Sequence, residues 1–207
     1  METCVIIQGP TVCDNVSMNK QSWKGYPIIF STWVGSDTNC YSPTDTIILN
    51  EYPEEKGIKN LNLQIISTLS GLYKAKELGF KRAIKWREDF YPTNPSELLK
   101  LFKSECINFY AYMNHENGYV TDFFMEGDID DMIDLFTIND IKVRYPEFAF
   151  TKRMYKLGLD SKINFIVKNI TEENNIVWKK LGYSLTRHTN EPMFMDSLPE
   201  IKHKDYE

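Results

Sequence analysis

Short apolar runs separated by turn-forming residues mark the predicted strands of this chain. The run C-V-I-I-Q ends at Gly9-Pro10, and P-I-I-F-S-T-W is followed by the loop G-S-D. Runs of this length that are bounded by glycine or proline are typical of strands buried in a sheet. The pattern predicts strands over Cys4–Gln8, Pro27–Trp33, Thr46–Leu49, Arg82–Trp86, Ile107–Met113, Tyr119–Met125 and Ile163–Val167.

A helical repeat of apolar positions fills the segment between the third and fourth of these strands. Asn60–Leu78 carries its apolar residues on one face, and Gly79 follows as a stop signal. Asp14 is the expected N-cap of an earlier helix, and Pro146 suits the first turn of a later one. The shorter predicted helices cover Asp14–Trp23, Pro95–Phe102, Asp128–Phe136 and Pro146–Leu157.

The alternation of strands and helices predicts the fold class. Short buried strands that alternate with helices favour an α/β domain with a mostly parallel central sheet flanked by helices. The chain has 207 residues, of which 42% are hydrophobic, and this length suits a single domain.

Composition and charge narrow the classes of function. The net charge is −5 and the pI is about 5.4, whereas binding to nucleic acid phosphates needs a dense basic surface, so we expect no nucleic acid partner. The N-terminus lacks the pattern of a signal peptide, and no apolar run approaches the roughly 20 residues of a membrane span. The four cysteines have no C-x-x-C spacing. We therefore expect reduced thiols, no zinc site of that kind and a cytoplasmic protein without a membrane span.

Polar or glycine-bearing segments follow four of the predicted strands. Ligands of open α/β sheets bind at the carboxyl ends of the strands. If the sheet is parallel through these strands, the four segments meet at one edge. They are Gln8–Thr11, Ser31–Trp33, Glu88–Asp89 and Glu126–Asp128.

The segment K-W-R-E-D-F-Y-P has two interpretations. An acidic pair after a strand is usually a solvated turn, but Glu88 and Asp89 leave a strand that should lie near the centre of the sheet. Mg²⁺ and Mn²⁺ bind one or two carboxylates together with substrate phosphates, so this pair is a candidate metal site. Lys85 and Arg87 share one face of the strand and can neutralise a phosphate or hold the carboxylates.

Three further positions have a structural and a chemical interpretation. Asp128 can favour the start of a helix, and Gly127 before it would allow close approach of a ligand to the backbone. Glu147 is either an ordinary first-turn carboxylate or a general base held by a helix N-terminus. His188 lies after the last strand, where a C-terminal loop can fold back over the site. The chain has no G-x-G-x-x-G, no P-loop and no G-x-S-x-G.

Several blocks in one order resemble a known family. They are V-I-I-Q-G-P, F-S-T-W-V-G-S-D, N-L-N-L-Q-I-I-S-T-L-S-G-L, I-K-W-R-E-D-F, T-D-F-F-M-E-G-D-I-D-D-M and Y-P-E-F-A-F. Together they are similar to the WavE-type family of lipopolysaccharide-synthesis glycosyltransferases, whose relatives also occur in large DNA viruses. The similarity spans roughly residues 4–158.

The resemblance implies a glycosyltransferase A (GT-A) fold, a nucleotide-sugar donor and a bound Mn²⁺ or Mg²⁺. It implies a Rossmann-like half for the nucleotide-sugar over 1–93, an acceptor-side half over 94–190 and a tail over 191–207. Asp89 becomes the expected metal ligand, with Glu88 beside it in place of a literal D-x-D and His188 as a further ligand. The residues expected to cradle the donor are Gln8, Gly9, Pro10, Thr11, Ser31, Trp33, Asp37, Asn60 and Gln64, with Lys85 or Arg87 near the phosphates, Gly127 under the sugar, and Asp128 or Glu147 as base.

The expected function is sugar transfer from a nucleotide-diphosphate donor to a carbohydrate acceptor, in polysaccharide or glycan synthesis. UDP is the commonest donor nucleotide in metal-dependent members of the fold, so a UDP-sugar, with UDP-glucose as the reference, is the expected donor by analogy. The chain is short for a complete transferase, so further domains of a longer polypeptide are an open alternative. Two other functions stay open: a nucleotidyltransferase acting on sugar phosphates, and a non-catalytic module that binds a carbohydrate or nucleotide.

Overall fold

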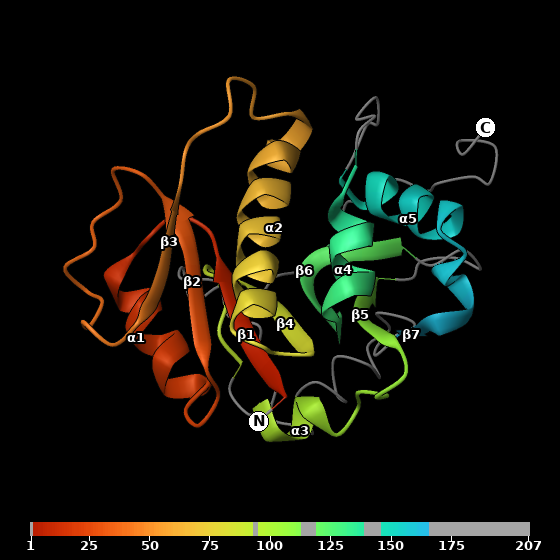
Figure 1. Cartoon of the computed structure of the whole chain (residues 1–207), viewed down its shortest axis with the longest axis horizontal. Helices are drawn as coiled ribbons and strands as arrows, with labels where there is room; N and C mark the ends of the chain where they lie inside the picture. The colour runs from red at the N-terminus through yellow and green to blue at the C-terminus, as the bar shows by residue number, and fades with distance from the viewer. Residues whose placement is uncertain (1, 93–94, 113–118, 139–145, 166–207) are drawn as a thin grey trace.

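A computed structural model describes residues 2–92, 95–112, 119–138 and 146–165 of the chain. In these residues one seven-stranded sheet runs through the molecule in the order β3-β2-β1-β4-β6-β5-β7 (Figure 1). Its strands are β1 (Thr3–Gln8), β2 (Ile28–Trp33), β3 (Thr46–Asn50), β4 (Arg82–Arg87), β5 (Ile107–Tyr112), β6 (Tyr119–Asp128) and β7 (Ile163–Phe165).

Every strand of this sheet except β6 runs in the same direction. β1 pairs in parallel with β2 on one side and with β4 on the other, and β2 pairs in parallel with β3. β6 is antiparallel to both of its neighbours, and β7 is parallel to β5. The predicted α/β class with a mostly parallel central sheet is confirmed.

Helices cover both faces of the sheet, as Figure 1 shows for the side that carries α2, α4 and α5. The helices α1 and α3 contribute to the core on the opposite face. The bounds are α1 (Cys13–Ser22), α2 (Leu61–Glu77), α3 (Pro95–Leu99), α4 (Ile129–Phe136) and α5 (Pro146–Lys156), with 3₁₀ turns η1 (Ile58–Asn60) and η2 (Leu159–Lys162).

The alternating side chains of β1 show why both faces are apolar. Cys4 and Ile6 point into the core shared with α2, α4 and α5, and Val5 and Ile7 point into the core shared with α1 and α3. Neighbouring side chains of a strand point to opposite faces, so a strand covered on both sides is a continuous apolar run. This explains why β1 was recognisable as a buried strand in the sequence.

Two details of the elements differ from the prediction. Val12, in an extended conformation, occupies the N-cap position of α1 without a side-chain cap, and Asp14 lies inside the first turn. β6 continues through Asp128, so Glu126–Asp128 is part of a strand and no loop follows Met125. The second difference changes the placement of the predicted site residues Gly127 and Asp128.

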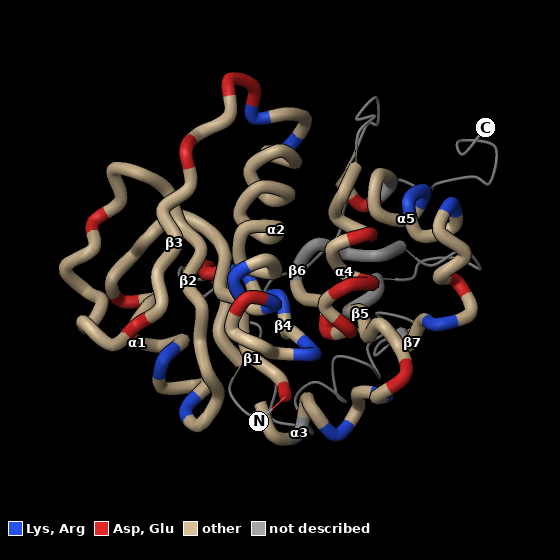
Figure 2. Tube along the Cα trace, viewed as in Figure 1, with Lys and Arg blue, Asp and Glu red and all other residues tan. Residues whose placement is uncertain are grey.

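Charges of both signs are spread along the described chain (Figure 2). Two ion pairs illustrate the difference between interior and surface charges. Arg82 of β4 holds Glu126 of β6 with both groups largely buried, whereas Lys76 of α2 contacts Asp130 of α4 with both side chains exposed. No helix in the described ranges is sufficiently long and apolar to span a bilayer.

The contact of α2 with β1 gives a stability prediction. A Cβ added at Gly71 would lie 2.3 Å from Cγ2 of Ile6, so the helix approaches the strand too closely for alanine. We expect Gly71→Ala to lower the free energy of unfolding by about 1–3 kcal/mol, because overpacking outweighs the higher helix propensity of alanine. Urea unfolding measures the change, with the neighbouring Ser70→Ala as control. A Gly71→Ala protein as stable as the wild type would contradict this packing.

Candidate functional site

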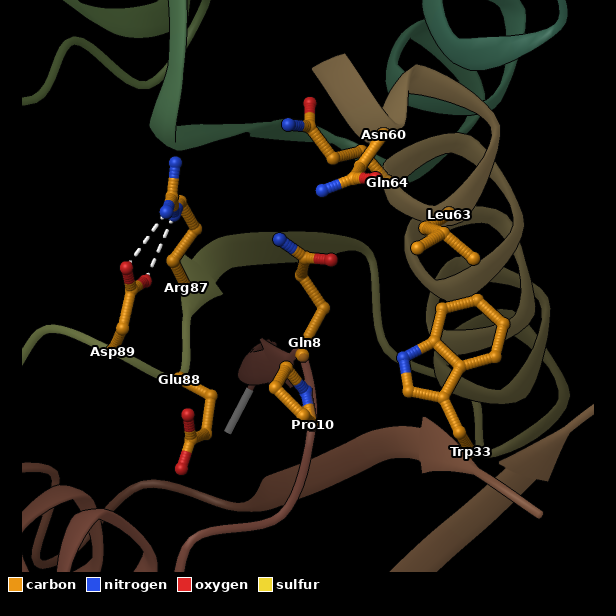
Figure 3. A pocket seen from close by; sticks show the side chains of 10 residues that line it. Gln8, Pro10, Trp33, Asn60, Leu63, Gln64, Arg87, Glu88 and Asp89 are labelled. Carbon is orange, nitrogen blue, oxygen red and sulfur yellow. Dashed lines mark hydrogen bonds and ion pairs between the residues drawn. The ribbon is translucent and has the colours of Figure 1, made fainter. Parts of the chain in front are cut away.

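A pocket of about 240 Å³ lies where the carboxyl ends of β1, β2 and β4 meet the first turn of α2 (Figure 3). The parallel register places Gln8 beside Ser31 on one side and beside Arg87 on the other. This is the edge of an open α/β sheet at which ligands bind. The residues that line the pocket are Gln8, Gly9, Pro10, Trp33, Asn60, Leu63, Gln64, Arg87, Glu88 and Asp89.

One side of the pocket is apolar and aromatic. Trp33 ends β2 and its indole stacks on Tyr52, with ring centroids 4.8 Å apart and an interplanar angle of 22°. Leu63 of α2 lies beside the indole, and Pro10 rises from the loop after β1 (Figure 3). Trp33 is only 3% exposed, so the Tyr52 stack and the surrounding core hold it in one orientation. Such a wall suits a flat or apolar part of a ligand.

Amide side chains form the centre of the pocket. Figure 3 shows Gln8 pointing from β1 toward Gln64 of α2 and Asn60, the last residue of η1. Oε1 of Gln8 accepts a hydrogen bond of 2.6 Å from the Ser67 hydroxyl, which fixes this side chain. Oε1 of Gln64 is buried and has no hydrogen-bond partner in the described structure. Buried polar atoms are normally satisfied, so a ligand that reached this oxygen through rotation of the Gln64 amide and donated a hydrogen bond to it would gain binding energy.

An ion pair forms the charged side of the pocket. Nε of Arg87 donates to Oδ1 of Asp89 at 2.8 Å, and Nη2 donates to Oδ2 at 2.7 Å (Figure 3). The guanidinium also lies 5.2 Å from the centre of the Phe90 ring. Two parallel charge-assisted hydrogen bonds are the strongest arrangement available to arginine and a carboxylate.

Glu88 points away from the side chains of the pocket, toward α1 (Figure 3). Its Oε1 accepts a hydrogen bond of 3.1 Å from the backbone N–H of Val12, and the residue is 4% exposed. Burial raises the pKa of its carboxyl to about 7, and hydrogen bonds from Asn15 and Val12 oppose the rise. Glu88 therefore caps the start of α1 from across the chain, a role that its sequence neighbours do not reveal.

Gly9, which follows β1, allows Glu88 to lie close to the backbone of this loop. A Cβ at Gly9 would lie 3.0 Å from Cβ of Glu88, and φ of Gly9 is +143°, a conformation that other residues rarely adopt. The backbone N–H of Glu88 donates to the Gln8 carbonyl at 2.9 Å. The loops that follow β1 and β4 are thus joined directly beneath the pocket.

The predicted metal site fits these residues only in part. Glu88 does not fit as a ligand, because its carboxylate faces α1. Asp89 faces the pocket, but both of its oxygens accept hydrogen bonds from Arg87. In the described ranges no three His, Cys, Asp or Glu side chains form a group that can hold a metal ion. Asp89 fits a cation whose other ligands come largely from substrate phosphates, provided that Arg87 releases it.

Four predicted donor-binding residues do not line the pocket. Thr11 hydrogen-bonds to Thr32 and Tyr41, which joins the loop after β1 to the segment after β2. Ser31 is fully buried and accepts a hydrogen bond from Asn50. The remaining two are Asp37, which accepts a hydrogen bond from the backbone of Asn39 in an exposed turn, and Lys85, which is fully buried in the middle of β4.

The expectation that Glu126–Asp128 joins the other loops at this edge is wrong. β6 is antiparallel to β4, and Asp128 and Gly127 pair with Arg82 and Ala83 at the start of β4, the opposite edge of the sheet. The Asp128 carboxylate caps α4 by accepting hydrogen bonds from the backbone N–H groups of Asp130 and Asp131. Capping of α4 is therefore a sufficient structural reason for an aspartate at position 128.

Glu147 and His188 remain of the predicted catalytic and metal-binding residues. Glu147 opens α5, as expected from the proline before it, but it is not among the lining residues. Its role as a base stays a prediction. His188 lies outside the described residues.

Two residues of the site were missed in the sequence. Leu63 lines the pocket in the first turn of α2, next to Gln64. Leu63 is an apolar residue that lies outside the core-facing stripe of α2, and this was the signal in the sequence that could have pointed to it. Asn15, which hydrogen-bonds to Glu88, is buried on α1, and no local pattern pointed to it.

Comparisons with solved structures support the fold. A protein assigned as a nucleotide-diphospho-sugar transferase from Desulfovibrio desulfuricans G20 superimposes with a TM-score of 0.55 at 9% identity, covering 81% of this chain and 80% of that chain. 4-Diphosphocytidyl-2C-methyl-D-erythritol synthase from Anaerococcus prevotii DSM 20548 superimposes with a TM-score of 0.52 at 12% identity, covering 84% of this chain and 93% of that chain. A glycosyltransferase involved in glycosylation of the major capsid of PBCV-1 superimposes with a TM-score of 0.50 at 8% identity, covering 79% of each chain.

No family model matches the chain, and no curated protein matches it either. At 8–12% identity the structural similarity establishes the fold alone. The chain has the fold of nucleotide-diphospho-sugar transferases, and its activity has to be argued from the pocket.

The raised pKa of Glu88 predicts a pH dependence of stability. In the unfolded chain this carboxyl loses its proton near pH 4.5, whereas in the folded protein it keeps the proton up to about pH 7. The free energy of unfolding therefore falls as the pH rises between these values, by roughly 3 kcal/mol in total from this group, and its contribution is constant above them.

Thermal unfolding between pH 4 and 8 measures this effect. Glu88→Gln cannot ionise, so its midpoint should decline less steeply with pH than that of the wild type. Glu77→Gln, at an exposed position of α2, should keep the wild-type slope. Equal slopes for Glu88→Gln and the wild type would show that Glu88 titrates normally.

Proposed function

We propose that this protein transfers a sugar from a nucleotide-diphosphate sugar, with a UDP-sugar as the first candidate, to a carbohydrate acceptor in glycan synthesis. The observation that carries the proposal is the composition of the pocket described above. An aromatic wall, an amide centre and a cationic edge lie side by side at the ligand-binding edge of the sheet. A nucleotide-diphosphate sugar has a flat base, a polar ribose and a charged diphosphate, so it matches all three.

The arrangement suggests how the donor binds. The base packs against Trp33 and Pro10, and the amides of Asn60 and Gln64 hydrogen-bond to polar atoms of the nucleoside. Arg87, which closes the other side of the pocket, binds a phosphate oxygen. The guanidinium is suited to this because its planar fork matches phosphate as well as carboxylate.

A divalent cation, Mn²⁺ or Mg²⁺, is part of the proposal, with Asp89 as its protein ligand. When bound, such a cation offsets the negative charge that develops on the leaving diphosphate. Asp89 contributes an anionic oxygen at the pocket edge, and Arg87 adds positive charge next to it. The WavE-type family remains the proposed affiliation on the strength of the sequence blocks.

Glu147 is the proposed general base for an inverting transfer. Deprotonation of an acceptor hydroxyl by a carboxylate contributes roughly 10²–10⁴-fold to the rate. In a retaining transfer the same carboxylate would instead stabilise positive charge on the sugar. The proposal places the acceptor on the side of the sheet formed by β5, β6 and α5.

A nucleotidyltransferase acting on sugar phosphates is the second candidate. It is favoured by the similarity to the diphosphocytidyl-methylerythritol synthase, which covers 84% of this chain. The first turn after β1, Q-G-P-T, has one glycine and no lysine or arginine. A nucleotidyltransferase usually has a glycine-rich phosphate loop with a basic residue there, so sugar transfer is the preferred function.

Donor binding predicts a ligand-dependent rise in thermal stability. UDP-sugars with Mn²⁺ should raise the unfolding midpoint by a few degrees, because a ligand at about 100 times its Kd stabilises the folded state by about 2.7 kcal/mol. Gln64→Ala should weaken this binding roughly tenfold, since it removes the unsatisfied acceptor of the pocket. Gln21→Ala on the exposed side of α1 is the control. No shift with any nucleotide sugar would contradict the proposed function, and a shift with free sugars alone would indicate a carbohydrate-binding module.

The products of turnover separate the two enzyme classes. A glycosyltransferase releases UDP from a UDP-sugar, whereas a nucleotidyltransferase releases pyrophosphate from a nucleoside triphosphate and a sugar phosphate. We expect UDP release with Mn²⁺, and Asp89→Ala should reduce it by roughly 10²–10³-fold because a charge-stabilising group is lost. Asp160→Asn, in the exposed turn η2, should leave the rate unchanged. Wild-type turnover in Asp89→Ala would remove Asp89 from the mechanism.

A further inference from the structure

The Arg87–Asp89 pair joins two groups that a nucleotide-diphosphate ligand would need separately. Arg87 is the last residue of β4, and Asp89 lies in the turn that follows, where the Phe90 N–H donates to the Arg87 carbonyl. Both side chains line the pocket. The cationic group suited to a phosphate and the carboxylate suited to a cation are therefore bonded to each other.

The pair is well aligned but accessible. Its two hydrogen bonds occupy both carboxylate oxygens, at 2.8 and 2.7 Å. The side chains are 22% and 33% exposed, in contrast to the Arg82–Glu126 pair between β4 and β6, in which Glu126 is 5% exposed. An ion pair in contact with solvent contributes little net stability, so a competing ligand can exchange with one of its members.

A phosphate is an effective competitor for Arg87. It offers the guanidinium the same two-oxygen geometry as a carboxylate, and a diphosphate carries more negative charge than Asp89. Once Arg87 has moved to the phosphate, Asp89 is an anionic oxygen ligand next to phosphate oxygens. Mg²⁺ and Mn²⁺ favour this combination of one carboxylate and substrate phosphates. Glu88 cannot replace Asp89, because its carboxylate is held against Val12.

We propose that Arg87 blocks Asp89 in the nucleotide-free protein and exchanges it for a phosphate of the ligand, so that cation binding requires the nucleotide. The inference deepens the proposed function and rests on it for the identity of the phosphate ligand. By linkage, the nucleotide and the cation each raise the affinity of the protein for the other by the same factor, typically 5- to 150-fold. Arg87 thereby prevents occupation of Asp89 by a cation without its substrate.

The blocking role can be tested without any nucleotide or activity. Mn²⁺ binding to the purified protein is measured by the loss of the free-ion electron paramagnetic resonance signal. Arg87→Gln removes the cation that holds Asp89, so this variant should bind Mn²⁺ at least tenfold more tightly than the wild type. Arg87→Gln/Asp89→Asn should lose the gain, which assigns the new site to Asp89.

Lys76→Gln is the matched control. Lys76 also neutralises an aspartate, Asp130, at 2.6 Å, but this pair lies on the surface between α2 and α4, away from the pocket. Freeing Asp130 should leave the Mn²⁺ affinity unchanged. If Lys76→Gln also bound Mn²⁺ more tightly, the loss of one positive charge would explain the effect of Arg87→Gln, and the inference would be overturned. If Arg87→Gln fails to fold by circular dichroism, Arg87→Met replaces it with the same expected gain, because methionine fills a similar volume but carries no charge to hold Asp89.

A second measurement distinguishes failure of this inference from failure of the proposed function. UDP binding to the wild type is followed by calorimetry with and without Mn²⁺, and we expect each to strengthen the other. If UDP binds but Arg87→Gln gains no Mn²⁺ affinity, the blocking role is wrong and the proposed function stands. If no nucleotide binds, the proposed function fails, while a gain of Mn²⁺ affinity in Arg87→Gln still supports the blocking role of Arg87.

Discussion

The parallel pairing of β1 with both β2 and β4 is the constraint on which the rest of the site depends. It sets Gln8 level with Ser31 and Arg87, so that three chain segments leave the sheet at one edge. Because side chains alternate along a strand, a register shift of one residue would turn Gln8 and Arg87 toward the opposite face. The pairing therefore determines which side chains the N-terminal end of α2 meets, and with them the chemical composition of the pocket.

Two adjacent carboxylates at the end of β4 have separate roles because they point in different directions. Glu88 is buried against the start of α1, where it joins two loops and keeps its proton to an unusually high pH. Asp89 faces the pocket and is held by Arg87. The structure thus assigns the acidic pair of the sequence to one structural carboxylate and one that a ligand can reach.

The direction of β6 sets the end of this strand apart from the pocket, which lies at the opposite edge of the sheet. Because β6 runs opposite to β4, Gly127 and Asp128 lie at the far edge, where Asp128 caps α4. The fold is shared with transferases of very low sequence identity. The similarity therefore establishes the architecture, and the chemistry has to be argued from individual side chains. In this chain the side chains that line the pocket include Trp33, Gln64, Arg87 and Asp89.

The sequence alone determined the elements of the fold and most of the pocket. Apolar runs and helical repeats arise from contacts between residues two to four positions apart, so β1, β4 and α2 could be read locally. Gln8, Trp33 and Asp89 followed from the ends of their strands, and Gln64 from the family resemblance. The tertiary structure alone decided that Glu88 caps a helix and that β6 is reversed. Glu88 and Val12 are 76 residues apart, and the direction of a strand depends on which neighbour it pairs with. Such pairings are long-range choices among many possible partners, and no local pattern of side chains encodes them.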